Sequence, residues 1–285
     1  MPDLAYVNGE IMPIERAVVP IEDRGYQFGD GVYEFVASYE GRPFMLEEHL
    51  DRLERSMREL AFDPISRADI RKAVLDMFTL SGYPRAGIYI QITRGVAPRN
   101  HAITPGMTSQ IVMTIRPVKE VPAEKRKKGA TAITVQDTRW GRCDIKTIQL
   151  LSNSLAKQKS LDAGCDDAIF VSDQGIVREG TSSNLFIVSG GRLTTHPLTD
   201  NILPGITRKV VMSLCTDVNL DVQESFFGTD ALLAADEVFL TGTVTELLPM
   251  VRIDKKSIGH GEVGPVTRRL YDLLRKKAMA GGGTT

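Results

Sequence analysis

Residues 32–60, VYEFVASYEGRPFMLEEHLDRLERSMREL, decide the fold class because the period of their apolar residues changes partway through. The run from Val32 to Tyr39 is apolar and rich in strand-forming residues, and Glu40-Gly41-Arg42-Pro43 has the composition of a turn. Phe44-Met45-Leu46 then predicts a short strand. From Leu46 to Leu60, leucine and methionine recur every three or four residues, which predicts an amphipathic helix. A strand followed by such a helix indicates a mixed fold.

Strands and helices are expected on both sides of this stretch. Asn8-Gly9 tolerates positive φ and predicts a hairpin between residues 4–7 and 10–12. The other expected elements are a helix between Ser66 and Gly82, strands at residues 88–93, 110–115, 131–135, 168–171, 185–188 and 237–240, a hairpin at Gly190-Gly191, and helices at residues 151–163, behind Pro204-Gly205 and at 266–278. They do not alternate regularly, and the sequence has neither a strand-linked GxGxxG nor a nucleotide phosphate loop. We therefore expect an α+β fold rather than a doubly wound sheet.

The chain has 285 residues, a length at which two domains are expected. Between Pro117 and Gly129 the sequence is rich in proline, glutamate and lysine and has no apolar period, which indicates an exposed connection. We predict an N-terminal α+β domain at residues 1–118, a linker at 119–128 and a C-terminal α+β domain at 129–285. The basic run from Lys125 to Lys128 is interpreted as a solvated part of this linker rather than a nucleic-acid patch.

The composition disfavours several classes of protein. The 35 Lys and Arg residues nearly cancel the 36 Asp and Glu residues, which argues against binding to nucleic acid or to a membrane surface through net charge. No apolar run approaches the roughly 18 residues of a membrane span, and the first residues lack the layout of a signal peptide, so a cytoplasmic location is expected. The three cysteines, Cys143, Cys165 and Cys215, have no CxxC spacing, which argues against a metal site and a disulfide framework.

Two segments of the first half carry candidate ligand-binding residues. Residues 23–34, DRGYQFGDGVYE, combine glycines that let backbone approach a ligand with Tyr33, whose hydroxyl could enter a site. Residues 93–101, TRGVAPRNH, contain Arg99, whose planar guanidinium suits a carboxylate, with His101 close by. Taken alone, the first segment also fits a structural turn and the second a surface ion pair.

The second half contains a candidate reactive lysine. Lys146 has apolar neighbours at Ile145 and Ile148, and withdrawal from water would favour the neutral amine that forms imines. The alternative is an ordinary solvated lysine.

A candidate acid and two candidate anion-binding segments follow it. Glu179 comes just before the small polar run Thr181-Ser182-Ser183-Asn184, which alone also fits a turn. Pro204-Gly205 opens an amphipathic helix whose free amides, with Thr207, fit a phosphate, and Thr241-Gly242-Thr243 has the same donor-rich character. Plain helix capping is the alternative for both anion-binding segments.

Taken in order, these segments resemble the class IV (fold-type IV) aminotransferases that use pyridoxal 5′-phosphate, and most closely the D-amino acid (D-alanine) aminotransferases. The resemblance runs from about Tyr6 to the last helix. The segments that carry it are DRGYQFGDGVYE, EEHLDRL, TRGVAPRNH, DIKTIQLL, EGTSSNLF and ILPGITR. It implies an enzyme with the two-domain α+β fold of that family.

The resemblance implies a pyridoxal-phosphate site around Lys146. This lysine would hold the cofactor as a Schiff base and move the proton between the substrate Cα and the cofactor. Glu179 would pair with the pyridine nitrogen and keep it protonated. The other implied cofactor contacts are Arg52, Ser182, Ser183, Asn184, Leu203, Ile206, Thr207, Gly242 and Thr243. Gly242 stands where close relatives carry a hydroxyl residue, so one phosphate contact is expected from a backbone amide.

The resemblance also implies how substrate is bound. Tyr33, Arg99 and His101 match the family's trap for the substrate α-carboxylate, which decides the face of Cα presented to Lys146. In that family the loop bearing the arginine and the histidine comes from the neighbouring subunit, so a homodimer is implied. The implied reaction transfers the amino group of a D-amino acid such as D-alanine to a 2-oxo acid such as 2-oxoglutarate or pyruvate.

Other readings stay open within the same fold. Branched-chain L-amino acid aminotransferases, (R)-selective amine transaminases and aminodeoxychorismate lyases share the lysine, the acid and the phosphate site. The Arg99-x-His101 pair favours the D-amino acid enzyme, because the amine transaminases take substrates without a carboxylate and the branched-chain enzymes arrange that pocket differently. A binding protein that kept the fold and lost turnover is disfavoured because Lys146 and Glu179 are both present.

Overall fold

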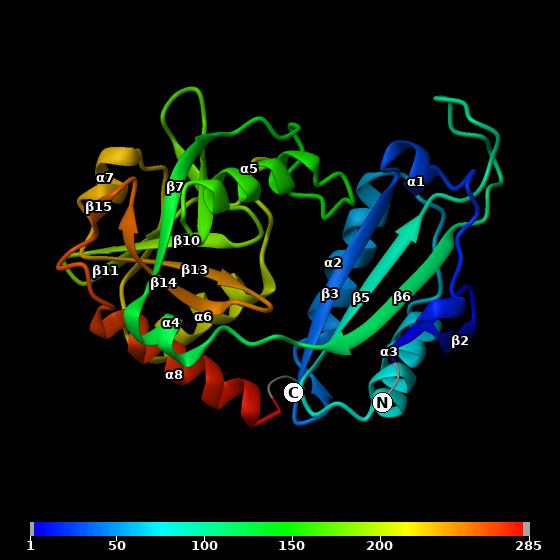
Figure 1. Cartoon of the computed structure of the whole chain (residues 1–285), viewed down its shortest axis with the longest axis horizontal. Helices are drawn as coiled ribbons and strands as arrows, with labels where there is room; N and C mark the ends of the chain where they lie inside the picture. Colours follow the sequence, from blue (N-terminus) through cyan, green and yellow to red (C-terminus); the bar gives the residue numbers. More distant parts are fainter. Residues whose placement is uncertain (1–2, 282–285) are drawn as a thin grey trace. The chain divides into compact units, whose positions relative to one another are not determined.

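The computed structural model describes residues 3–281, which divide into two compact units (Figure 1). The first unit contains residues 3–118, 145–149 and 278–281, and the second contains residues 119–144 and 150–277. The segment 145–149, which carries Lys146, therefore belongs to the first unit although the residues before and after it belong to the second. Each unit contains strands and helices, as the predicted α+β class requires.

The first unit is an antiparallel sheet that packs against two helices. Its strands, in spatial order, are β2 (Glu10–Pro13), β1 (Leu4–Val7), β6 (Gln110–Pro117), β5 (Ala86–Thr93), β3 (Gly31–Tyr39) and β4 (Arg42–Pro43). The helices α2 (Leu46–Glu59) and α3 (Arg67–Ser81) contact these strands, and Figure 1 shows α2 running along β3. Their apolar faces and the inner face of the sheet form one core.

The apolar periods place these elements as predicted. Along β5, Ile88, Ile90 and Ile92 are fully buried while the residues between them are half-buried. Along α2, the apolar residues of the predicted series, Leu46, Leu50, Leu53 and Met57, are buried. At the start of α3 the Ser66 Oγ accepts a hydrogen bond from the amide of Asp69 at 3.3 Å.

One local prediction in the first unit is wrong, and one short helix was not predicted. Phe44-Met45-Leu46 is not a strand, because Met45 adopts φ 55° as the cap of α2 and Leu46 already belongs to the buried face of that helix. The glycine-containing segment at 23–34 includes a short helix, α1 (Arg24–Phe28), whose first turn is fixed by a 2.7 Å bond from the Gly25 amide to the Asp23 carboxylate. A 3-10 turn, η1 (Ile14–Arg16), follows β2.

The second unit is a mixed sheet that closes on itself. Its strands, in order, are β12 (Val222–Glu224), β11 (Arg192–Thr195), β10 (Asn184–Ser189), β13 (Glu237–Gly242), β14 (Glu246–Ile253), β7 (Ala130–Gln136), β8 (Asp167–Val171) and β9 (Val177–Gly180), with β15 (Lys256–Ser257) beside β14. Because β9 pairs with both β8 and β10, the strands from β10 to β9 form a closed circuit. The junction is the pair Glu179–Asn184.

Helices surround this sheet. The helix α5 (Leu151–Asp162) contacts β7 and β8, and α6 (Ile206–Asp217) contacts β13. The remaining helices are α4 (Ala123–Lys128), α7 (Thr229–Leu233) and α8 (Pro265–Met279). None of the helices in the described part of the chain has the length and hydropathy that crossing a membrane requires.

The segment between Pro117 and Gly129 differs from the predicted exposed connection. It contains α4, and Arg126 is largely buried. Its guanidinium donates to the carboxylate of Glu246 at 2.8 Å and to the carbonyls of Thr245 and Leu247 at 3.1 and 3.0 Å. The interpretation of the whole basic run as solvated was therefore wrong for Arg126, because its acceptors lie more than 100 positions later in the sequence.

Candidate active site

Lys146 is anchored between the sheet and a helix of the first unit. Its carbonyl accepts a hydrogen bond from the Tyr33 amide on β3 at 2.9 Å, and its amide donates to the Ser56 hydroxyl on α2 at 3.3 Å. Its Nζ lies 4.1 Å from the centroid of the Tyr33 ring. Ile145 and Thr147 are buried, and the Lys146 side chain is half-buried. The backbone on both sides thus fixes where the amine can reach.

Arg52 belongs to a buried charged cluster near this lysine. Its guanidinium binds both oxygens of Glu34, with Nε to Oε1 at 2.6 Å and Nη2 to Oε2 at 2.9 Å, and the Nδ1 of His49 lies 2.7 Å from Oε2. Glu34 is fully buried. Burial raises its pKa, but the charges and hydrogen bonds of Arg52 and His49 hold that pKa well below its usual range. Burial also lowers the pKa of His49.

Arg99 and His101 lie together on an exposed loop of the first unit. The Arg99 guanidinium is 4.5 Å from the centroid of the Phe28 ring and donates weakly to the Gln27 carbonyl, and the His101 ring lies 5.5 Å from the same Phe28 ring. The buried Arg24 holds the loop by donating to the carbonyl of Asn100 at 2.6 Å. Arg99 and His101 therefore form one group, while Tyr33 lies beside Lys146 and Tyr89.

Glu179 lies at the junction that closes the sheet of the second unit. Its Oε1 accepts from Arg139 Nη1 at 2.5 Å, and its Oε2 accepts from Asn184 Nδ2 at 3.0 Å and from the Leu203 amide at 3.1 Å. The structure thus brings together Glu179, Asn184 and Leu203, three of the residues named from the sequence. Burial raises the pKa of Glu179, and the Arg139 charge opposes that rise.

The start of α6 faces the same residues. Gly205 is the N-cap and provides no side chain to the free amides, and Ile206 and Thr207 of the first turn are buried. A Cβ at Gly205 would lie 2.0 Å from the Asn184 Oδ1, so only glycine permits this approach. The helix start and the Glu179 cluster are therefore parts of one site.

Small hydroxyl residues complete this part of the site. Ser183, Thr241 and Thr245 each have a buried hydroxyl oxygen without a hydrogen-bond partner among the described residues. A Cβ at Gly242 would lie 2.7 Å from Thr245 Oγ1 and 3.8 Å from Ser183 Cβ, which places the Thr245 hydroxyl and the Ser183 side chain beside Gly242. Orphaned hydroxyls beside free helix amides fit a phosphate, which accepts hydrogen bonds from both. Ser182 is exposed and Thr243 is half-buried.

Several polar residues of these clusters were not predicted from the sequence to have a role in the site: Glu34, His49, Arg139, Thr245 and Asp137, whose carboxylate accepts hydrogen bonds from Arg139. Glu34 had a usable signal, because it lies on the same face of β3 as the buried Val32 and Val36, so a carboxylate interrupts an apolar series. Arg139 had none, since its partner Glu179 comes 40 positions later.

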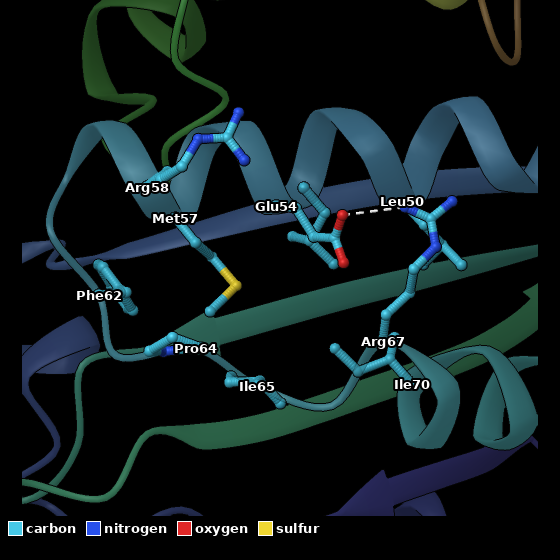
Figure 2. A pocket seen from close by; sticks show the side chains of 10 residues that line it. Leu50, Glu54, Met57, Arg58, Phe62, Pro64, Ile65, Arg67 and Ile70 are labelled. Atoms are coloured by element: carbon cyan, nitrogen blue, oxygen red, sulfur yellow. Dashed lines mark hydrogen bonds and ion pairs between the residues drawn. The ribbon is translucent and has the colours of Figure 1, made fainter.

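A cavity of about 230 Å³ lies elsewhere in the first unit (Figure 2). Its lining is mostly apolar, with Glu54, Arg58 and Arg67 at its edge, and includes Leu50, Leu53, Met57, Phe62, Pro64, Ile65 and Ile70. None of the predicted site residues lines it. The described residues contain no cluster of three or more His, Cys, Asp or Glu that could hold a metal ion, and Cys143, Cys165 and Cys215 are free thiols.

Known proteins match nearly the whole chain. The sequence pattern of the family "Amino-transferase class IV" matches residues 31–253. A D-alanine aminotransferase of Bacillus licheniformis is 41% identical over 274 residues, which are 96% of each chain, and one of Staphylococcus haemolyticus is 39% identical over 95% of this chain and 96% of its own.

Solved structures of related enzymes have the same fold. The branched-chain amino acid aminotransferase of Escherichia coli superposes with a TM-score of 0.92 at 26% identity, over 100% of this chain and 97% of its own. The T.th. branched-chain amino acid aminotransferase with pyridoxamine 5′-phosphate superposes with a TM-score of 0.91 at 28% identity, over 98% and 94%. With the family pattern covering most of the sequence, this chain belongs to the class IV aminotransferases.

Proposed function

We propose that this chain binds pyridoxal 5′-phosphate and transfers the amino group of a D-amino acid such as D-alanine to a 2-oxo acid such as 2-oxoglutarate or pyruvate. The observation that carries the proposal is the 36–41% identity with proteins named D-alanine aminotransferase over nearly the full length of both chains. The related T.th. structure, which contains pyridoxamine 5′-phosphate, supports the cofactor. The cytoplasmic location expected from the sequence stays a prediction.

The residues of the second unit fit this cofactor. Ser183, Thr207 and the amides at the start of α6 would bind the phosphate, together with the half-buried Thr243 and the backbone of Gly242. Glu179 would accept the hydrogen bond of a protonated ring nitrogen. When bound, the cofactor supplies an electron-poor ring that makes the substrate Cα proton acidic.

Lys146 would bind the cofactor aldehyde covalently and carry the proton. Its anchored backbone and the Tyr33 ring 4.1 Å from Nζ restrict where the amine can lie. A base held in this way gains its efficiency from position, because it needs no further ordering at the moment of proton transfer. In the proposed role, Arg52 would add positive charge at the phosphate while it stays paired with Glu34.

The substrate carboxylate is assigned to Tyr33, Arg99 and His101. Arg99 and His101 lie on an exposed loop, and a fork-shaped guanidinium with an imidazole nearby suits a carboxylate. We propose that this loop acts on the site of the neighbouring subunit in a homodimer.

A substrate panel tests the proposal. Protein loaded with the cofactor is mixed with D-alanine, L-alanine, L-leucine or an (R)-amine, each with 2-oxoglutarate, and the new amino acid is measured. The proposal predicts transfer from D-alanine, its loss in Lys146→Ala and its retention in the exposed-lysine control Lys276→Ala. Transfer from L-leucine without transfer from D-alanine would instead indicate a branched-chain enzyme. Transfer from the (R)-amine alone would indicate an amine transaminase. Pyruvate release from aminodeoxychorismate without any 2-oxo acid, with no amino-group transfer in the panel, would indicate a lyase.

A further inference from the structure

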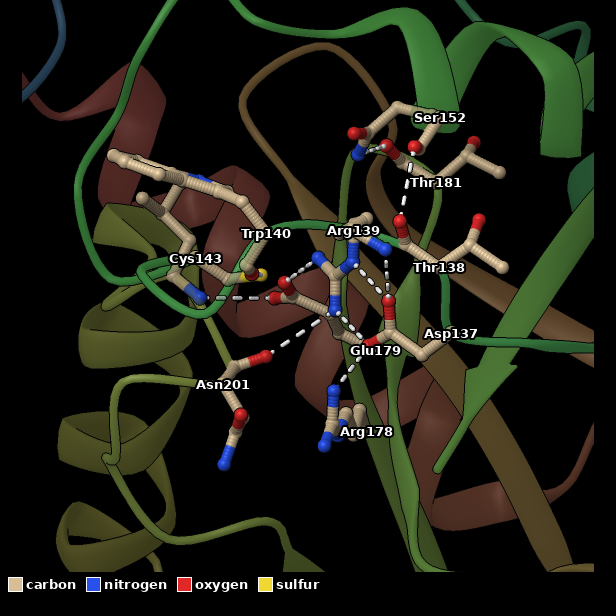
Figure 3. Close-up of polar contacts among 12 residues, drawn as sticks. Asp137, Thr138, Arg139, Trp140, Cys143, Ser152, Arg178, Glu179, Thr181 and Asn201 are labelled. Atoms are coloured by element: carbon tan, nitrogen blue, oxygen red, sulfur yellow. Dashed lines mark hydrogen bonds and ion pairs between the residues drawn. The ribbon is translucent and has the colours of Figure 1, made fainter. Parts of the chain in front are cut away.

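A buried chain of alternating charges ends at Glu179 (Figure 3). Arg178 Nη1 lies 2.7 Å from Asp137 Oδ2. Asp137 in turn binds Arg139 in a two-pronged pair, with Nε to Oδ1 at 2.9 Å and Nη2 to Oδ2 at 2.8 Å. Arg139 Nη1 reaches Glu179 Oε1 at 2.5 Å. The side chains of Asp137, Arg139 and Glu179 are 0, 7 and 6% exposed, so water screens these charges little.

Contacts within the protein hold Arg139 in this position. Besides the pair with Asp137, its guanidinium donates to the Asn201 carbonyl at 3.2 Å and lies 4.2 Å from the centroid of the Phe170 ring. The thiol of Cys143 donates to the Trp140 carbonyl at 3.2 Å, and burial raises its pKa to about 11, so it stays neutral. The charge of Arg139 is therefore directed at the two carboxylates.

The hydrogen bonds of Glu179 show which form of its carboxyl group fits. An ionised carboxylate can accept about four hydrogen bonds, and three are already supplied by Arg139, Asn184 and the Leu203 amide. All three partners donate. A protonated Glu179 would have to donate to a group that has no acceptor to offer in this arrangement. The ionised form fits, and it leaves one acceptor position for an N–H.

Arg139 has a larger effect on Glu179 than on any group bound beyond it. Burial raises the pKa of Glu179, and the Arg139 guanidinium is the main opposing influence. Because the interaction of two charges falls with distance, a cation touching Oε1 lowers the proton affinity of the carboxylate more than that of a ring nitrogen on its far side. A proton shared between that nitrogen and Glu179 is thereby moved toward the nitrogen.

We propose that Arg139 is a positioning residue that keeps Glu179 ionised and oriented, so that the proton shared with the cofactor's ring nitrogen stays on the nitrogen. This inference rests on the proposed function, since it requires the cofactor to be bound with its ring nitrogen at Glu179. Asp137 fixes the guanidinium and Arg178 balances the charge of Asp137. The electron-withdrawing power of the ring then depends on a residue that does not touch the cofactor.

The test uses pyridoxal 5′-phosphate labelled with ¹⁵N in its ring, bound to the full-length protein, with the ¹⁵N chemical shift as the measurement. The variants are Arg139→Met, which removes the charge, Arg139→Gln, which keeps a donor without charge, and Arg139→Lys, which keeps the charge. Arg85→Met is the matched control, because Arg85 also stacks on an aromatic ring, that of Tyr39 at 3.9 Å, but lies in the first unit. Thermal unfolding of each variant without cofactor checks that the variant is folded.

The inference predicts a protonated ring nitrogen at neutral pH in the wild type, in Arg85→Met and in Arg139→Lys. In Arg139→Met and Arg139→Gln the signal should move toward that of an unprotonated nitrogen, and kcat with D-alanine should fall at least about tenfold with a smaller change in KM. If Arg139→Met does not fold, Arg139→Gln supplies the same comparison.

Two failures are distinguishable. If the wild type binds cofactor at Lys146 and the nitrogen signals of Arg139→Met and Arg139→Gln equal that of the wild type, the role of Arg139 is wrong and the proposed function stands. If the wild type binds no cofactor, or shows an unprotonated nitrogen, the inference is overturned as well, and the absence of binding would also overturn the proposed function.

Discussion

Several residues of the candidate site are buried charges, and the contribution of one of them, Glu34, to the stability of the protein can be measured. Glu34→Gln leaves Arg52 and His49 without a buried anion, so we expect the cofactor-free protein to lose about 3–5 kcal/mol of unfolding free energy. The control Glu40→Gln removes an exposed partner of Arg42, and it should change the unfolding free energy by less than about 1 kcal/mol. Denaturant unfolding at neutral pH measures both. Equal effects of Glu34→Gln and Glu40→Gln would contradict the burial of the Glu34 ion pair.

Glu34 should also make the unfolding free energy depend on pH. Because the native state holds the pKa of Glu34 below its value in the unfolded chain, the stabilisation is complete above the unfolded pKa of about 4.3 and is lost as pH falls toward the native pKa. In a His49→Asn background, which removes the other titrating group of this cluster, the effect of Glu34→Gln should therefore be constant from about pH 5 to 7 and shrink below about pH 4. In that background, an effect of Glu34→Gln that grows on acidification would contradict the ion pair.

At the scale of elements, the start of α6 can lie close to Asn184 only because Gly205 has no Cβ. Gly205→Ala would place a Cβ 2.0 Å from Asn184 Oδ1 and displace the side chain that donates to Glu179 at 3.0 Å. A lost hydrogen bond to a charged group costs about 1.5–3 kcal/mol, so the Kd for cofactor should rise roughly ten- to a hundredfold. Gly141→Ala is the control, because a Cβ there meets nothing within 4 Å. Cofactor titration followed by absorbance gives both constants.

Elements whose apolar residues follow one period could be predicted, and others could not. The alternation of Ile88, Ile90 and Ile92 and the leucine series of α2 are local patterns, and both gave the observed elements. The strand β14 was missed because nearly all of it is buried, which removes the alternation, and because it contains Pro249. The helix α4 has no apolar period, and Arg126 ties it to β14, a partner distant in sequence.

The same division holds for the candidate site. Residues next to glycines or at a helix start, such as Glu179, Asn184 and Thr207, could be named from local motifs and from the family resemblance. The partners that set their charge could not. Asp137 and Arg139 follow β7, whereas Glu179 lies on β9, and the pairing of both strands with β8 brings these residues together.

At the scale of the whole molecule, the proposed homodimer predicts that defective chains complement one another. Arg99→Ala lacks the proposed carboxylate-binding residue and Lys146→Ala lacks the proposed reactive amine, so each variant alone should be nearly inactive. If Arg99 acts on the neighbouring subunit's site, refolding the two variants together gives mixed dimers with one intact site, and about a quarter of the wild-type activity should return. No recovery, in mixtures shown to contain mixed dimers, would contradict the shared site.

The most direct test of the whole account is to find which amine holds the cofactor. The wild-type protein loaded with pyridoxal 5′-phosphate is reduced with borohydride, which makes the carbon–nitrogen link permanent, then digested and mapped by mass spectrometry. We predict that the added mass is on Lys146 alone and is absent from Lys146→Ala treated in the same way. Modification of another lysine, or an unmodified Lys146 in protein that has bound the cofactor, would contradict the account.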